Sequence, residues 1–199
     1  MANNNAPFGF RQFSGTGSVP TFEQVEVAIT AGTAGAIFFG DPVSPLADGS
    51  VAQAVSSSAT TPLQLAGIFA GCKYLSVAQK RTIWANYYPG GTDPVVGSAT
   101  AYIINDPNAQ FVVQSDATGV APGDVNATFG FVIGTGNTAN GISGAYLTVA
   151  NAGVAGNPFR VVSIIKDPPT APGTLGNGQP FDWAVVAFNN VQTKTAVSI

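Results

Sequence analysis

The sequence predicts an all-β fold, either a single compact antiparallel β-barrel or a sandwich of short strands with long Gly/Pro loops. Roughly ten short apolar segments are separated by turn-forming residues about every 8–12 residues, as in sandwiches and barrels. Glycine and proline are abundant, with 24 and 14 residues, and no segment sustains the spacing of an amphipathic helix. No period of about 20–50 residues repeats, which argues against a solenoid or a propeller.

Residues 1–20 are predicted to form an extended N-terminal arm that precedes a β domain at 21–199. The arm is rich in Asn, Gly and Ser, a composition that cannot form a packed element by itself. Its large aromatic and basic side chains are Phe8, Phe10, Arg11 and Phe13. Two interpretations are open: a frayed terminus, or an arm whose phenylalanines bind a neighbouring subunit as aromatic anchors.

The first strands of the β domain are indicated by alternation and by short apolar runs. Val25, Val27 and Ile29 alternate with polar or small residues, which is typical of a half-buried strand. Further strands are predicted at 36–39 and 51–55. A run of Ser, Thr and Pro follows the second of these and predicts a loop.

The densest apolar stretch, 65–114, is predicted to form the centre of the sheet. It begins with an apolar strand at 65–69, followed by a Gly-Cys break, a polar excursion and a second strand around 83–84. Residues 99–104 and 110–113 are then expected to form a hairpin, because the Asn-Asp-Pro-Asn segment between them supplies turn chemistry.

The C-terminal part continues with short strands separated by glycine-rich loops. Alternating Phe129, Phe131 and Ile133 indicate one strand, and the Gly- and Asn-rich segment 134–141 is predicted to be an exposed loop. The remaining strands are predicted at 146–149, 159–165, 183–188 and 191–197. The long Gly/Pro loop at 167–180 is expected to be functional or mobile, as long loops in compact domains tend to be.

The chain carries unusually few charges. Charged residues make up 9% of it, against about a quarter in an average soluble domain, and such a surface is suited to contact with other protein. The net charge of −3 argues against nucleic-acid binding, which requires a basic face. The sequence contains no apolar run of about 18 residues and therefore predicts no membrane span. The N-terminus lacks the features of a signal peptide, so we expect synthesis in a cytoplasm.

The sequence predicts no catalytic, cofactor-binding or metal-binding residue, and we expect a protein that is not an enzyme. Histidine is absent, which excludes Ser-His-Asp and Cys-His sites and removes a common zinc ligand. Four carboxylates could still converge in space: Asp93, Asp106, Asp116 and Asp124. Nearby Pro, Asn or Gly residues favour turn and cap roles for them. The one cysteine, Cys72, is predicted to be a buried apolar residue, with an interchain disulfide or a reactive thiol as alternatives.

Two clusters in the central stretch are candidates for contact with a partner. The basic cluster is Lys73, Lys80 and Arg81, and the aromatic cluster is Trp84, Tyr87 and Tyr88. The basic cluster forms either a solvated face or a contact with acidic patches, where charge sets register more than affinity. The aromatic cluster fits the core, but it also fits an interface, because Tyr and Trp combine an apolar body with a hydrogen-bonding group.

Several segments of the chain share a recognisable pattern. They are Gly67-Ile68-Phe69-Ala70-Gly71-Cys72-Lys73-Tyr74, Trp84, Tyr87-Tyr88-Pro89-Gly90-Gly91-Thr92, Ala101-Tyr102-Ile103-Ile104-Asn105-Asp106-Pro107 and Phe111-Val112-Val113-Gln114, with weaker matches at Gly136-Asn137-Thr138 and Arg160-Val161-Val162. This pattern resembles the head cement or decoration proteins of tailed bacteriophages, small structural proteins encoded beside the major capsid protein. Where that family usually has two acidic residues before the proline, this chain has Asn105-Asp106.

The resemblance implies a virion structural protein, a cement subunit that binds the outer surface of a phage head and bridges neighbouring major capsid proteins. The expected partners are the major capsid protein and further copies of the chain, as a homo-dimer or homo-trimer. We expect no cofactor, and synthesis in the cytoplasm of the host bacterium. The residues expected at capsid or subunit contacts are Phe8, Phe10, Arg11, Phe13, Lys73, Lys80, Arg81, Tyr87 and Tyr88.

An alternative of a different class is a carbohydrate-binding β-module associated with a phage tail or fibre. In that case Tyr87, Tyr88 and Trp183 would stack on sugar rings, with Asp and Asn side chains holding the hydroxyls. Solvent exposure of Trp183 beside a concave carboxylate pair favours the sugar-binding alternative, and burial of Trp183 together with a large flat interface favours the cement role.

Overall fold

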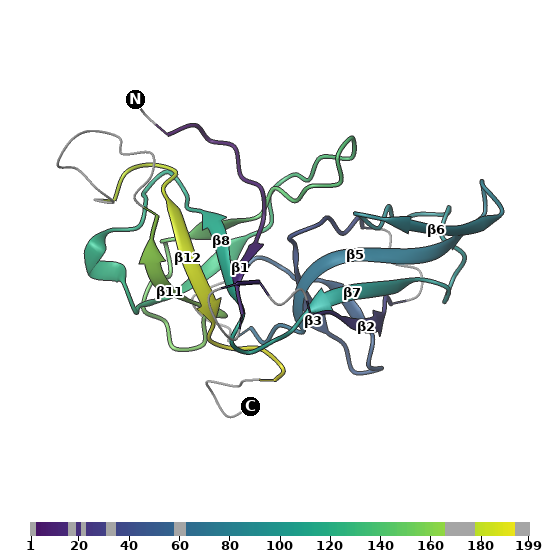
Figure 1. Cartoon of the computed structure of the whole chain (residues 1–199), viewed down its shortest axis with the longest axis horizontal. Coiled ribbons are helices and arrows are strands. Elements are labelled where there is room, and N and C mark those ends of the chain that lie inside the picture. Colours follow the sequence, from purple (N-terminus) through teal and green to yellow (C-terminus); the bar gives the residue numbers. More distant parts are fainter. Residues whose placement is uncertain are drawn as a thin grey trace.

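The computed structural model describes residues 3–15, 19–20, 23–30, 35–57, 63–165 and 178–193, and it confirms the predicted all-β architecture (Figure 1). Two antiparallel sheets of six strands each pack together as in a sandwich. Within the described ranges the helical structure is one 3-10 turn, Pro122–Asp124. The described part of the chain therefore has no helix that is long and apolar enough to cross a membrane.

The first sheet combines the N-terminal strand with the C-terminal half of the chain. Its strands are, in spatial order, β1 (Arg11–Ser14), β8 (Gln110–Gln114), β12 (Trp183–Phe188), β11 (Phe159–Ile164), β9 (Thr128–Val132) and β10 (Tyr146–Thr148). A parallel bridge between Ser115 and Leu147 brings the edge strand β10 back to the end of β8. The first sheet is therefore strongly curled.

The second sheet is built from the strands that lie between β1 and β8 in the sequence. Its main order is β2 (Val25–Ala28), β7 (Thr100–Ile104), β5 (Gly67–Ser76), β3 (Pro42–Pro45) and β4 (Val51–Gln53), and β6 (Arg81–Ala85) also pairs with β5. Strand β3 pairs with the beginning of β5 and β6 with its last five residues, so the two follow each other along one edge of β5. A parallel bridge between Ile29 and Val51 connects the two ends of the main order.

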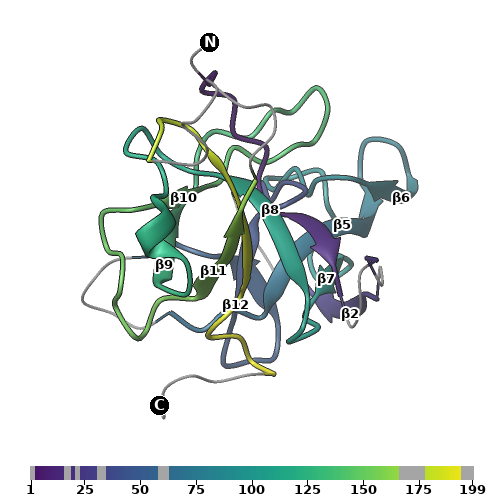
Figure 2. The same cartoon turned by 60° about the vertical axis from the view of Figure 1, so that its left-hand side comes forward.

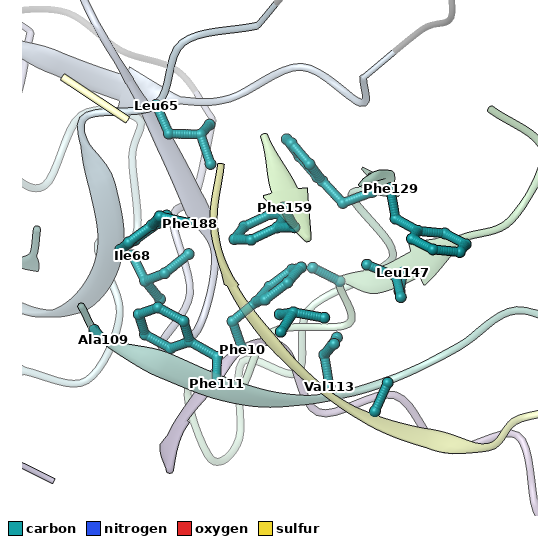
Figure 3. Packing of buried hydrophobic residues seen from close by; sticks show 14 of the residues in the cluster. Phe10, Leu65, Ile68, Ala109, Phe111, Val113, Phe129, Leu147, Phe159 and Phe188 are labelled. Atoms are coloured by element: carbon teal, nitrogen blue, oxygen red, sulfur yellow. The ribbon is translucent and has the colours of Figure 1, made fainter. Parts of the chain in front are cut away.

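Phenylalanines dominate the larger hydrophobic cluster, which lies on one face of the first sheet (Figure 3). Phe10 stacks on Phe159 with ring centroids 4.3 Å apart and meets Phe131 edge to face at 6.3 Å. Phe188 stacks on Phe159 at 5.9 Å and receives Phe111 edge to face at 5.0 Å. The rings come from β8, β9, β11, β12 and the residue before β1, so the cluster holds segments together that are distant in the sequence.

The described residues of the segment predicted as an arm at 1–20 pack on the first sheet, with β1 at Arg11–Ser14. Phe10 is 1% exposed, and β1 pairs with β8. Upstream of it, Ala6 N–H donates to Gln114 Oε1 at 3.0 Å, and Asn3 Nδ2 donates to Asp182 Oδ1 at 2.9 Å. Polar composition does not indicate this packing, because it comes from pairing with β8 and from hydrogen bonds to Gln114 and Asp182, which short-range pattern cannot show.

The beginning of β5 and the end of β7 contribute side chains to both hydrophobic clusters. Ile68 pairs with Ile104, and both side chains belong to the larger cluster. The adjacent pair, Phe69 and Ile103, belongs to the smaller cluster on the opposite face of the second sheet. Because side chains alternate between faces along a strand, this end of the second sheet is buried on both sides.

A buried carboxylate connects the two sheets. Asp41 is 1% exposed and accepts hydrogen bonds from Phe38 N–H at 2.8 Å and from Gln53 Nε2, in β4, at 2.8 Å. It also accepts one from the hydroxyl of Ser143, which lies between β9 and β10 of the first sheet. Burial raises the pKa of Asp41 above its usual value, although these hydrogen bonds oppose the shift.

The predicted hairpin of 99–104 with 110–113 is wrong in its pairing. The turn itself forms, with Ala109 N–H donating to the carbonyl of Asp106 at 3.0 Å. However, β7 pairs with β2 and β5, whereas β8 pairs with β1 and β12 in the other sheet. The chain crosses between sheets here because apolar residues on both sides of the turn, Ile104 and Phe111, are buried in the larger cluster.

Other predicted elements shift in extent. The strand predicted at 36–39 forms only single bridges, from Ile37 to Tyr88 and from Phe39 to Ile142. The Gly-Cys pair predicted as a break after 65–69 does not end the strand, because β5 runs through it as one strand of 10 residues, Gly67–Ser76. The predicted long loop at 167–180 and strand at 191–197 lie largely outside the described residues.

Candidate functional site

The described residues do not form a metal-binding cluster. They include no group of three or more Cys, Asp or Glu side chains that could hold a metal ion. Three of the four candidate carboxylates accept hydrogen bonds from residues two or three positions away: Asp106 from Asn108 N–H, Asp116 from Thr118 N–H and Asp124 from Ala121 N–H. The turn and cap roles predicted for these three are confirmed. Asp93 instead accepts hydrogen bonds from Ser76 Oγ and Ala78 N–H, and so connects its loop to the β5–β6 turn.

Cys72 is a buried residue of the smaller cluster, as predicted. It is 1% exposed, and its thiol contacts the carbonyl oxygen of Tyr87 at 3.4 Å. Burial raises the pKa of this thiol to about 12. The thiol is therefore protonated at neutral pH, and it lacks the thiolate character that a nucleophile or a metal ligand requires.

The aromatic candidates are distributed differently from the prediction. Tyr88 is 4% exposed and belongs to the smaller cluster, whereas Tyr87 is half-buried and stacks on Phe38 at 5.4 Å. Tyr88 is therefore a core residue, and the contact role expected for Tyr87 stays a prediction. Trp84 lies at the surface with 68% of its area exposed. Trp183 is 44% exposed and meets Phe8 edge to face at 5.1 Å.

The four candidates near the N-terminus are likewise separated. Phe10 is in the core, and Phe8 is partly covered by Trp183. Arg11 lies over the ring of Phe39 at 5.1 Å. Phe13 is 50% exposed and is therefore the aromatic ring of this group that remains available to a partner.

The basic candidates occupy the outer face of the second sheet and its end. Lys73 forms an ion pair with Glu26 at 2.8 Å and lies 5.7 Å from the centre of the Tyr102 ring. The hydrogen bond to Glu26 raises the pKa of Lys73. Lys80 and Arg81 are exposed in and after the β5–β6 turn. The cluster is thus divided between a neutralised lysine and two charges at the tip.

The β5–β6 hairpin projects from the body of the molecule, and its turn lies at the far end of the second sheet in both views (Figures 1 and 2). A bulge between Phe69 and Gly71 marks the change from the buried half of β5 to the projecting half. Bulges bend a strand and increase its twist. The second half of β5 is therefore directed away from the first sheet.

Exposed apolar side chains gather at the end of this projection. Leu75 is 40% exposed, Val77 55%, Val95 36% and Val96 73%. The 93–98 loop lies along β5, since Val77 N–H donates to the Asp93 carbonyl at 2.8 Å and Val95 N–H to the Leu75 carbonyl at 2.9 Å. We define the distal face as Leu75, Val77, Val95 and Val96 together with Lys80 and Arg81.

A hollow of about 390 Å³ lies next to the distal face on the same outer side of the sheet. Its lining includes Gly71, Trp84, Asn86 and Tyr102. Trp84 Nε1 donates to the hydroxyl of Tyr102 at 3.3 Å, across the intervening strand β5. We call these four residues the aromatic hollow.

Sequence reasoning missed most of the distal face and the aromatic hollow. A signal was present, because Lys73, Leu75 and Val77 alternate with Cys72, Tyr74 and Ser76, and only the second set is buried. The contribution of the 93–98 loop could not be anticipated, since it depends on pairing with β5.

Comparisons with protein-family profiles, curated proteins and solved structures found no match to this chain.

Proposed function

We propose that this chain is a structural protein of a phage virion, a cement or decoration subunit that binds the outer surface of the head and bridges neighbouring major capsid proteins. The distal face is the observation that carries the proposal, together with the sequence resemblance. Four aliphatic side chains are exposed at the end of the projecting hairpin and on the 93–98 loop that is hydrogen-bonded to it. Contiguous exposed apolar patches mark interaction sites on proteins that otherwise bury such surface.

The charge at the distal face indicates which partner surface fits. Lys80 and Arg81 are exposed at the tip of a chain whose net charge is −3. The nearby Asp93 carboxylate already accepts hydrogen bonds from Ser76 Oγ at 2.8 Å and Ala78 N–H at 3.0 Å. A partner with an apolar patch beside carboxylates therefore complements this face, and the charges set the register of docking.

Capsid binding of this kind stabilises the head by mass action. A ligand that binds only the assembled shell shifts the equilibrium toward assembly. Modest individual contacts suffice if one homo-dimer or homo-trimer on a local symmetry axis contacts several capsid subunits at once. The proposal places the protein on the outer surface of the head after synthesis in the host bacterial cytoplasm, with no contact to nucleic acid or membrane.

Replacing Val96 with aspartate is expected to weaken head binding at least tenfold, because it buries a carboxylate without a partner in an apolar interface. The measurement is co-sedimentation of the purified chain with heads assembled from the major capsid protein encoded beside it. The matched control is Val55→Asp, since Val55, in the segment after β4, is 72% exposed and Val96, in the 93–98 loop, is 73% exposed. Val55→Asp should bind as the wild type does.

Equal binding by both variants would remove the distal face from the interface. Absence of binding by the wild type to assembled heads would overturn the cement role itself. An Arg81→Glu variant should bind heads more weakly than the wild type does. This loss should be larger at low salt than at high salt, because salt screens exposed charges.

A further inference from the structure

We infer that the aromatic hollow is a binding site for a neutral pyranose ring. This site is separate from the proposed capsid contact and uses different side chains. Sugar rings carry apolar C–H faces bordered by hydroxyl groups, so they bind where an exposed aromatic face lies beside hydrogen-bonding groups. Trp84, which is 68% exposed, supplies the face, and its polar neighbours line the same hollow.

The indole ring is held in position before any ligand arrives. Trp84 lies on β6, opposite Lys73, and Tyr102 lies on β7, opposite Gly71. The hydrogen bond from Trp84 Nε1 to Tyr102 Oη, 3.3 Å long, therefore spans β5 diagonally. It satisfies the indole N–H and restricts the ring, and such preorganisation reduces the entropy that binding costs.

The absence of a side chain at Gly71 leaves the floor of the hollow open. Gly71 lies between the two aromatic residues, at the bulge in β5, with a φ of +131°. A Cβ atom there would come within 3.2 Å of the carbonyl oxygen of Ala85. The hollow has a volume of about 390 Å³, which lies in the range of about 300–1,000 Å³ that is usual for small-molecule sites.

The border of the hollow favours a neutral, hydroxyl-rich ligand. The ammonium of Lys73 is paired with Glu26 at 2.8 Å, so this pair presents little net charge to an anion or a cation. Asn86 is exposed and offers both a donor and an acceptor in its amide. The hydroxyl of Tyr102 adds a further polar group. Hydroxyl groups, which donate and accept, match this set.

The two tryptophans of the chain make a direct test possible. In a Trp183→Phe variant, Trp84 is the only indole, and its fluorescence should change saturably on titration with cellotetraose or maltotetraose, with a dissociation constant of about 1 mM. In the matched Trp84→Phe variant, only Trp183 reports, and its fluorescence should not respond. Glycerol at the same hydroxyl concentration controls for solvent effects.

A second variant separates recognition from folding. Asn86→Ala, at an exposed position, should lower the affinity for the tetraose at least threefold without changing the thermal unfolding midpoint. No saturable change with either tetraose up to about 20 mM, twentyfold above the expected dissociation constant, would overturn the inference. A response to benzyl alcohol or adenosine without a response to the tetraoses would overturn the ligand class. Neither result bears on the capsid proposal, which Val96→Asp tests.

Discussion

Replacing Phe10 with alanine is expected to lower the free energy of unfolding by about 3–5 kcal/mol, the usual cost of removing a buried phenylalanine. The ring is 1% exposed and lies between Phe159 and Phe131 in the larger cluster. The cavity left by the substitution would be bounded by the other rings and could not collapse easily. Urea denaturation at neutral pH measures the difference.

Phe13→Ala is the matched control, since Phe13 lies in β1, three residues after Phe10, and is 50% exposed. Its substitution should cost less than about 1 kcal/mol, as most surface changes do. Equal stabilities of Phe10→Ala and the wild type would show that the N-terminal segment is not part of the core. The original prediction of an independent arm would then be restored.

Replacing Asp41 with alanine is expected to cost about 3 kcal/mol or more. Three donors, Phe38 N–H, Gln53 Nε2 and the Ser143 hydroxyl, would lose their acceptor in a buried environment. Because they belong to both sheets, the loss should affect the whole fold in one cooperative transition. Circular dichroism during thermal unfolding should show a single lowered midpoint. An unchanged midpoint would mean that water replaces the carboxylate.

The raised pKa of Asp41 makes this stability depend on pH in a defined direction. A carboxyl whose pKa is higher in the folded state contributes most below its unfolded-state pKa, near 3.8, and that contribution is lost as pH rises through the folded-state pKa. The wild type should therefore lose stability relative to Asp41→Asn between pH 3 and the folded-state pKa. If the wild type instead gains stability relative to Asp41→Asn over this pH range, the pKa of Asp41 is not raised in the folded state.

Strand positions followed from local pattern, but strand pairing did not. The alternation of Val25, Val27 and Ile29 predicted a strand, and β2 is found at Val25–Ala28. The turn after Ile104 was predicted equally well, yet its flanking strands enter different sheets. The destination of a strand depends on which cluster buries its side chains, and Phe10 shows that a polar segment can contribute to a core.

The candidate site was only partly predictable for a related reason. Lys80 and Arg81 lie at the exposed tip, where a contact was expected. Tyr87 and Tyr88 are expected at contacts from residue type and from the resemblance, whereas Tyr88 is buried in the smaller cluster and Tyr87 stacks on Phe38. For Trp84 the sequence leaves core and interface both open, and its outward direction follows from its register with Lys73.

The position of β12 has a consequence for biosynthesis. This strand lies between β8 and β11, yet it is the last described strand to leave the ribosome. Until it arrives, the nascent chain presents two unpaired strand edges and an incomplete set of phenylalanines, which is the kind of intermediate that aggregates. Truncation just before Trp183 should therefore yield insoluble protein, and the yield of the intact chain should depend on chaperones that protect it until translation ends.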